Sequence, residues 1–271
     1  MLTQNKILTP CLQSKKELSL RTLSIVFGVP VVIGMVYLGS PFIDSLVLML
    51  LVGMLCEWSR LNTKISFHPL CLLMFMQTWL FYYMPSIPLS AHGVTMLILL
   101  TAGFAFSHLS WLRYILFVAG AVYITLATLI LLALSEQKFL IIWLLSIVWA
   151  TDVGAYLFGS LLKGPKLAPR LSPHKTWAGF MGGILAALCV GWSLQKKMGS
   201  YFQPPFSPLG LILILSVAAH LGDLLESMFK RYFGVKDTGH IIPGHGGLLD
   251  RLDSLLLVAI VYGIILVFAK L

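Results

Sequence analysis

Carboxylates are the scarce chemical groups of this chain, because only ten Asp and Glu occur among 271 residues. Five of them, Asp152, Asp223, Glu226, Asp250 and Asp253, lie at the ends of three apolar stretches. Asp250 and Asp253 are three residues apart, and Asp223 lies a few turns before two basic residues, so helical spacing predicts shared faces. Two acidic helix faces can hold a hard divalent cation, with phosphate oxygens and water completing its coordination.

The alternative is that these charges only neutralise one another. Asp223 would then pair with Lys230, and Asp250 with Arg251 or Arg231. A single pair of this kind is often structural, but burying the whole cluster for that purpose would carry a net cost. Carboxylates inside apolar segments therefore indicate a functional site.

Two basic loops adjoin the carboxylates. The loop near 160–177 is stiffened by prolines and has the run SPHKTW at 172–177, and we interpret it as an anion-binding loop. The loop near 231–251 has glycines at 244, 246 and 247, which allow backbone amides to face a phosphate. The alternatives are a cytoplasmic loop that obeys the positive-inside rule and a plain tight turn.

Apolar helices must position these residues. The chain is 58% hydrophobic and 11% charged, against about 25% charged in an average soluble protein. A soluble globule of this composition would expose large apolar patches, so we expect an all-α, polytopic integral membrane protein. The four cysteines form no CxxC pair and are interpreted as small apolar residues. Met1 begins a polar stretch, so no cleavable signal peptide is expected.

Apolar runs predict about nine transmembrane helices. Segment 1–21 is expected to be cytoplasmic, 22–138 to hold helices one to five, and 139–271 to form the catalytic region with helices six to nine. The nine runs cover residues 22–39, 42–56, 68–84, 92–107, 112–134, 139–161, 178–195, 208–229 and 252–270.

The basic residues set the predicted orientation. With nine helices, 15 of the 19 Lys and Arg fall on the side of the N-terminus and 4 on the other. The positive-inside rule then places the N-terminus and the carboxylate cluster at the cytoplasmic face. The same residues are scattered between apolar runs rather than gathered in a stripe, so a nucleic acid is not an expected partner.

A long motif spans the second loop. It reads Ser227-x-Phe229-Lys230-Arg231, four residues, and Lys236-Asp237-x-Gly239-x-x-Ile242-Pro243-x-His245-Gly246-Gly247-Leu248-x-Asp250-Arg251-Leu252-Asp253. This motif resembles the signature of the phosphatidate cytidylyltransferase (CDP-diacylglycerol synthase) family. Ser172-Pro173-x-Lys175-Thr176-Trp177 and Asp152-x-x-Ala155-Tyr156 are also similar to motifs of that family. Ala178 departs from the family pattern, which has Glu there, so no carboxylate is available at that position.

The resemblance implies the reaction of CTP with phosphatidic acid to give CDP-diacylglycerol and pyrophosphate, with Mg²⁺ and with room for a second, monovalent cation. It implies that Asp223, Asp250 and Asp253 bind the metal. Catalytic roles are implied for Asp223, Asp250, Lys230 and Arg231. Phosphate binding is implied for Ser172, Lys175, Thr176, Ser227, Lys236, His245, Gly246, Gly247 and Arg251. His220, one turn before Asp223, is interpreted as a partner of that carboxylate.

The expected partners are CTP, phosphatidic acid and membrane lipids. The expected location is a bacterial cell (inner) membrane, and a homodimer is an alternative to a monomer. One alternative is a related membrane enzyme with another lipid acceptor, such as an archaeal-type lipid cytidylyltransferase or a polyprenol or phytol kinase. The other is a transporter or channel, which would place polar residues at mid-membrane on several helices. The first five predicted helices carry few such residues. A CDP-alcohol phosphotransferase would need a DGxxAR motif, which the sequence lacks.

Overall fold

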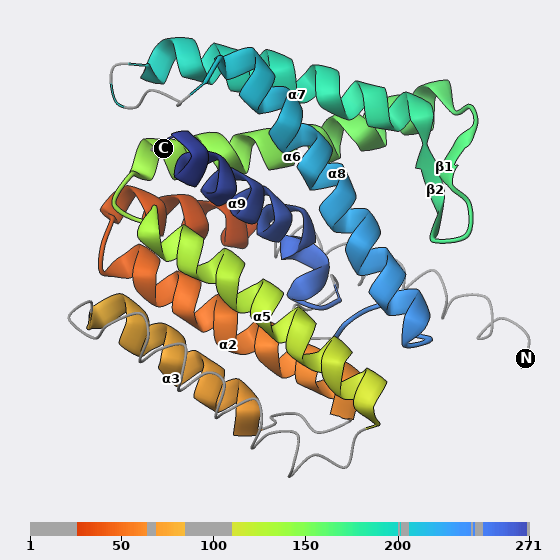
Figure 1. The fold of residues 1–271 in the computed structure, drawn as a ribbon. Coiled ribbons are helices and arrows are strands. Elements are labelled where there is room, and N and C mark those ends of the chain that lie inside the picture. Colours follow the sequence, from red (N-terminus) through yellow and green to blue (C-terminus); the bar gives the residue numbers. More distant parts are fainter. Residues whose placement is uncertain are drawn as a thin grey trace, which may run out of the picture.

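The computed structural model describes residues 26–63, 69–84, 110–199, 201, 206–239, 241 and 246–269, and these residues are mainly helical. A helix over Val26–Leu38 precedes the labelled elements of Figure 1. The labelled helices are α2 (Phe42–Thr63), α3 (Pro69–Tyr83), α5 (Trp111–Ala133), α6 (Lys138–Leu162), α7 (Trp177–Met198), α8 (Pro208–Tyr232) and α9 (Leu249–Ala269).

Six of these helices, α2 and α5 to α9, are long and apolar enough to cross a membrane. This finding supports the predicted all-α integral membrane protein. The helix Val26–Leu38 and the apolar part of α3 are shorter. The helix predicted at 92–107 and the segment 1–21 lie outside the described residues, so the count of nine and the orientation stay predictions.

Two apolar cores hold the helices together, and α9 contributes to both. In the first core, Trp143 of α6 is fully buried and its indole Nε1 donates a hydrogen bond of 2.9 Å to the Gly191 carbonyl of α7. In the second core, Trp58 of α2 donates a bond of 2.8 Å to the Phe117 carbonyl of α5. Figure 1 shows α9 running between the layer of α6 and α8 and the layer of α2 and α5. The start of α9 is therefore held from both sides.

A close approach of α8 to α9 brings two acidic residues together. A Cβ added at Gly222 would lie 2.6 Å from the Asp253 carbonyl oxygen and 3.1 Å from the Cα of Ser254. Only a residue without a side chain allows this spacing between the helices. Asp223, next to Gly222, is consequently held at the level of the first turn of α9.

The structure differs from the sequence predictions in two places that matter for the site. The helix predicted at 42–56 continues to Thr63, past Glu57, whose side chain is buried inside the molecule. The loop predicted near 160–177 contains a hairpin of β1 (Lys166–Ala168) and β2 (Ser172–Thr176). These strands are antiparallel, with Lys166 opposite Thr176 and Ala168 opposite Ser172.

Candidate active site

One end of the helix bundle gathers the elements that carry the sequence motifs. Figure 1 shows the β1–β2 hairpin between α6 and α7 on the side of the molecule toward which α8 runs. Thr176 ends β2 and also caps α7, because its Oγ1 accepts a hydrogen bond of 3.1 Å from the amide of Gly179. The cap fixes β2, and with it Lys175, relative to the membrane helices.

Asp250, in the first turn of α9, is the most heavily bonded of the predicted site residues. Its Oδ1 accepts a hydrogen bond of 2.8 Å from Lys230 Nζ of α8. Its Oδ2 accepts bonds from the amide of Thr238 (2.9 Å), the hydroxyl of Thr238 (3.1 Å) and the amide of Gly247 (2.8 Å). Asp250 therefore pairs with Lys230, and it also holds the glycine loop.

Glu57 of α2 is the site residue that the sequence analysis missed. Its carboxylate is 1% exposed and accepts hydrogen bonds from the amides of Leu248 (2.8 Å) and Leu249 (2.9 Å) and from the Thr238 hydroxyl (3.2 Å). It belongs to no motif that we identified. The signal available in the sequence was a lone acidic residue directly after an apolar run, and we assigned it no role.

Asp223 forms the second ion pair of the site, with the hairpin. Its Oδ2 lies 2.6 Å from Lys175 Nζ, and the two side chains remain 36% and 20% exposed. Arg231, two turns later on α8, donates a bond of 3.3 Å from Nε to the Leu171 carbonyl. The hairpin is thus attached to α8 at two points, and the carboxylate between them stays accessible.

Glu226 and Asp253 lie between these two pairs. Lys230 Nζ is 3.5 Å from Glu226 Oε2, and Asp253 Oδ1 accepts a bond of 2.6 Å from the amide of Ser254. Both oxygens of Glu226 are buried and have no hydrogen-bond partner among the described residues. Two carboxylates and one lysine therefore share a small buried space.

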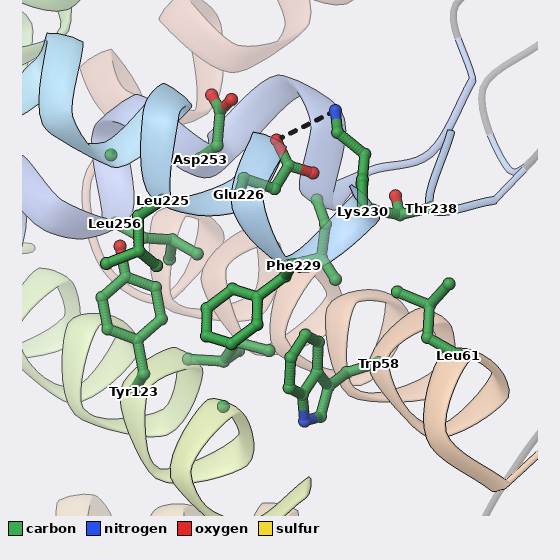
Figure 2. A pocket seen from close by; sticks show the side chains of 14 residues that line it. Trp58, Leu61, Tyr123, Leu225, Glu226, Phe229, Lys230, Thr238, Asp253 and Leu256 are labelled. Atoms are coloured by element: carbon green, nitrogen blue, oxygen red, sulfur yellow. Dashed lines mark ion pairs between the residues drawn. The ribbon is translucent and has the colours of Figure 1, made fainter. Parts of the chain in front are cut away.

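This acidic group borders a pocket between α2, α5, α8 and α9. Figure 2 shows Glu226, Lys230 and Asp253 on one side of the pocket. Rings of Trp58, Tyr123 and Phe229 lie on the other side in the same view. The pocket therefore has a charged wall beside an apolar one.

The donor atoms of this group suit a hard cation. Both Glu226 oxygens are buried and accept no hydrogen bond from the described part of the chain. In those described ranges, no three His, Cys, Asp or Glu side chains are already arranged as metal ligands. Carboxylate oxygens are nevertheless the ligands that a hard divalent cation prefers in proteins.

The other residues predicted to contact phosphate lie in several elements. Ser172, Lys175 and Thr176 all lie on β2, and Ser227 is buried on α8. Lys236 and Arg251 are exposed, while Gly246 and Gly247 precede α9. His245 lies outside the described residues.

His220 has a different contact from the one we interpreted. It is buried on α8, and its ring Nε2 lies 3.2 Å from the Phe180 carbonyl of α7. Its ring also lies against the Phe180 ring, at 4.7 Å between centroids. His220 therefore joins α7 to α8 through Phe180.

The fold and the site together define an all-α integral membrane protein with a charged site at one end of its helices. The profile of the Cytidylyltransferase family matches residues 19–269, and the chain belongs to this family. A phosphatidate cytidylyltransferase of Brucella suis biovar 1 (strain 1330) is 48% identical over 122 residues, covering 44% of this chain and 43% of the relative. A phosphatidate cytidylyltransferase of Staphylococcus aureus (strain COL) is 47% identical over 133 residues, covering 49% and 51%. The chain thus spans about half the length of the curated relatives it matches.

Proposed function

We propose that this protein is a phosphatidate cytidylyltransferase, which converts CTP and phosphatidic acid into CDP-diacylglycerol and pyrophosphate. The observation that carries the proposal is the meeting of two separated motifs and Asp223 at one end of the bundle. Lys175 comes from the hairpin, Asp223 and Lys230 from α8, and Asp250 from α9, and they are joined by ion pairs of 2.6 and 2.8 Å. The names and identities of the relatives support the same reaction.

In the proposed reaction, a phosphate oxygen of the lipid attacks the α-phosphorus of CTP. The bond from that phosphorus to the bridging oxygen of the β-phosphate breaks, and pyrophosphate leaves. Phosphate monoesters are largely ionised at neutral pH, so the attack needs no general base. Both reactants are anions, so the protein must mainly position them and offset their repulsion. Lys175 and Lys230, each already beside a carboxylate, supply positive charge for this purpose.

Mg²⁺ is part of the proposal. Asp223 and Asp253 would hold it through their carboxylates. Asp250 would hold it through Oδ1 in exchange for Lys230 Nζ, because its Oδ2 accepts bonds from the loop. The ion, when bound, neutralises phosphate oxygens and stabilises the leaving pyrophosphate. The buried Glu226 carboxylate offers further oxygens beside it, which supports room for a second, monovalent cation.

The phosphate contacts are proposed on both sides of the carboxylates. Arg231 and the β2 residues would approach from the hairpin. On the other side the glycine loop would contribute Lys236 and the backbone near Gly246, because the amides of Gly247, Leu248 and Leu249 already donate to Asp250 and Glu57. We assign phosphate contacts to Ser172, Lys175, Thr176, Ser227, Lys236, His245, Gly246, Gly247 and Arg251.

The orientation and location follow from the charge asymmetry. The site end carries most of the basic residues, while Lys138, Lys196 and Lys197 lie near the other ends of α6 and α7. We therefore propose that the site faces the cytoplasm, where CTP is dissolved, in a nine-helix protein of the bacterial inner membrane. The proposal leaves a homodimer as the alternative to a monomer. Light scattering of the purified protein distinguishes the two states by mass.

The position of the transferred phosphorus tests the reaction. Purified protein is incubated with Mg²⁺ and phosphatidic acid vesicles and with CTP labelled at either the α- or the γ-phosphorus. We expect α-label, and no γ-label, in the lipid product. Transfer of γ-label would identify a lipid kinase, and the absence of lipid label beside an active control enzyme would contradict the proposal. Replacing phosphatidic acid by a polyprenyl phosphate tests the alternative acceptor.

A further inference from the structure

We propose that Glu57 is a positioning residue for the glycine loop, acting from the N-terminal half of the chain on the site built by the C-terminal half. The described residues that take part are Thr238, Gly239, Gly247 and Leu248 of the loop, together with Leu249 at the start of α9. The effect on turnover rests on the proposed function, whereas the effect on the loop does not.

Glu57 is separated from its partners by about two-thirds of the chain. The sequence distance to Leu248 is 191 residues, and the bonds of 2.8 and 2.9 Å join α2 to the first amides of α9. These amides have no partner within their own helix, and a carboxylate at a helix N-terminus is favoured by both hydrogen bonding and the helix dipole. Glu57 therefore caps α9 from another element, although Asp250 stands in the same turn.

The loop wraps closely around the Glu57 carboxylate, and two of its glycines make this possible. A Cβ at Gly239 would lie 2.5 Å from Glu57 Oε1. A Cβ at Gly247 would lie 2.8 Å from Glu57 Oε2 and would also collide with the Thr238 hydroxyl. Glycine is therefore required at these two motif positions because the Glu57 carboxylate packs directly against them.

Thr238 links Glu57 to the charged residues of the site. Its hydroxyl lies 3.2 Å from Glu57 Oε2 and 3.1 Å from Asp250 Oδ2. Asp250 in turn accepts the bond from Lys230, which also approaches Glu226. A shift of the Glu57 carboxylate would move Thr238 and the Gly247 amide. These two residues supply the hydrogen bonds that Asp250 Oδ2 accepts.

Glu57→Gln removes this function while keeping the size of the side chain. Both Glu57 oxygens accept backbone amides, whereas Gln offers one oxygen and one NH₂ group, so one amide would face another donor. Because misplacement of a site by about 1 Å can cost about 100-fold in rate, we expect kcat to fall about 100-fold. Glu57 does not line the phosphate site itself, so KM for CTP should stay within about 3-fold.

Asp44→Asn is the matched control. Asp44 is also a buried carboxylate of α2, 1% exposed, and it accepts a bond of 2.7 Å from Ser40. It precedes Glu57 by 13 positions on the same helix, which is about 20 Å along the axis. We expect kcat of this variant to stay within about 2-fold of the parent, even if its melting temperature falls.

If Glu57→Gln does not fold, Thr238→Val tests the same chain of contacts, and Thr238→Ser, which keeps the hydroxyl, should restore kcat. Equal kcat in the Val and Ser variants would contradict the proposal.

Hydrogen exchange tests the positioning without relying on activity. The amides of Gly247, Leu248 and Leu249 should exchange about 10-fold faster in the Glu57→Gln protein and at the parental rate in the Asp44→Asn protein. If the parent makes no CDP-lipid but the exchange behaves as expected, the proposed function is wrong and the positioning of the loop stands. If the parent is active and the Glu57→Gln protein matches it in kcat and exchange, the positioning proposal is overturned.

Discussion

The carboxylates on the two sides of the site are held in different ways. On the loop side, Asp250 and Glu57 accept hydrogen bonds from Lys230, from the amide of Thr238 and from the amides that precede or begin α9. The single hydroxyl hydrogen of Thr238 is shared between the two carboxylates. On the hairpin side, Asp223 has one ion pair with Lys175 at 2.6 Å and stays 36% exposed. Both sides carry residues of the motifs, apart from Glu57.

This difference separates two roles. A buried carboxylate whose oxygens are all bonded is fixed in place and fixes its donors in turn. An accessible carboxylate with a single lysine partner can exchange that partner for a cation or a phosphate-bound ion more easily than a fully bonded one. We therefore assign Glu57 and Oδ2 of Asp250 to positioning, and the hairpin side to ligand binding. Asp253 and Glu226 lie between them, and Asp250 Oδ1 would join the metal ligands in exchange for Lys230.

Asp223→Asn should have the largest effect on turnover. It removes the accessible charge of the hairpin side, and we expect kcat to fall about 10³-fold, the range found when a group that stabilises transition-state charge is lost. CDP-lipid formation from labelled CTP measures this loss. Glu136→Gln, at an exposed carboxylate between α5 and α6, is the control and should be fully active. A near-normal rate of the Asp223→Asn protein would remove the metal assignment.

Asp250→Asn should reduce kcat by about 100-fold, because an amide group would face the donors Thr238 and Gly247 and displace the loop. The same assay measures it, with the Glu136→Gln protein again as the control. A rate above a tenth of the parental value would mean that the loop keeps its position without the Asp250 carboxylate. This result would contradict the contrast between the two sides of the site.

Lys175→Ala should act mainly on binding. It removes a charge-assisted contact from β2, and we expect KM for CTP to rise about 10-fold with a smaller change in kcat. Steady-state kinetics at varied CTP measure both constants. Lys166→Ala, at an exposed position on the neighbouring strand, is the matched control. If KM and kcat were both unchanged, the hairpin would be a basic loop set by membrane topology alone.

His220→Gln should have the smallest effect. A Gln amide can still reach toward the Phe180 carbonyl, and that contact lies between helices rather than at Asp223. We expect kcat and KM within about 2-fold of the parent and a small decrease in the melting temperature. A loss of Mg²⁺ dependence or a large loss of kcat would instead support the role beside Asp223 that the sequence suggested.

Several helices could be predicted closely from hydropathy. The bounds predicted for α5, α6 and α8 differ from the structure by at most a few residues, because long apolar runs end at clear polar breaks. The paired hairpin was not predictable in the same way, since a proline-rich basic run carries no alternation that indicates strands.

The sequence did not predict the pairings of the candidate residues. The motif contains Lys230 and Asp250, and Asp223 stood out as a carboxylate inside an apolar run. Spacing along a helix suggested Asp223 with Lys230, whereas the structure joins each to a different element. The partner of Asp223 comes from β2. Glu57 was missed because its role depends on a contact across 191 residues, which no local pattern contains.

The thermal stability of two variants tests the contrast most directly. The melting temperatures of the Asp223→Asn and Asp250→Asn proteins are compared with that of the parent in the same detergent. Breaking the buried Asp250 network should cost about 3–5 kcal/mol, so we expect a decrease of about 10 °C for Asp250→Asn. Asp223→Asn, which loses one accessible ion pair, should melt within about 2 °C of the parent. Equal decreases in the two variants, or a larger decrease for Asp223→Asn, would contradict the assignment of positioning to one side and ligand binding to the other.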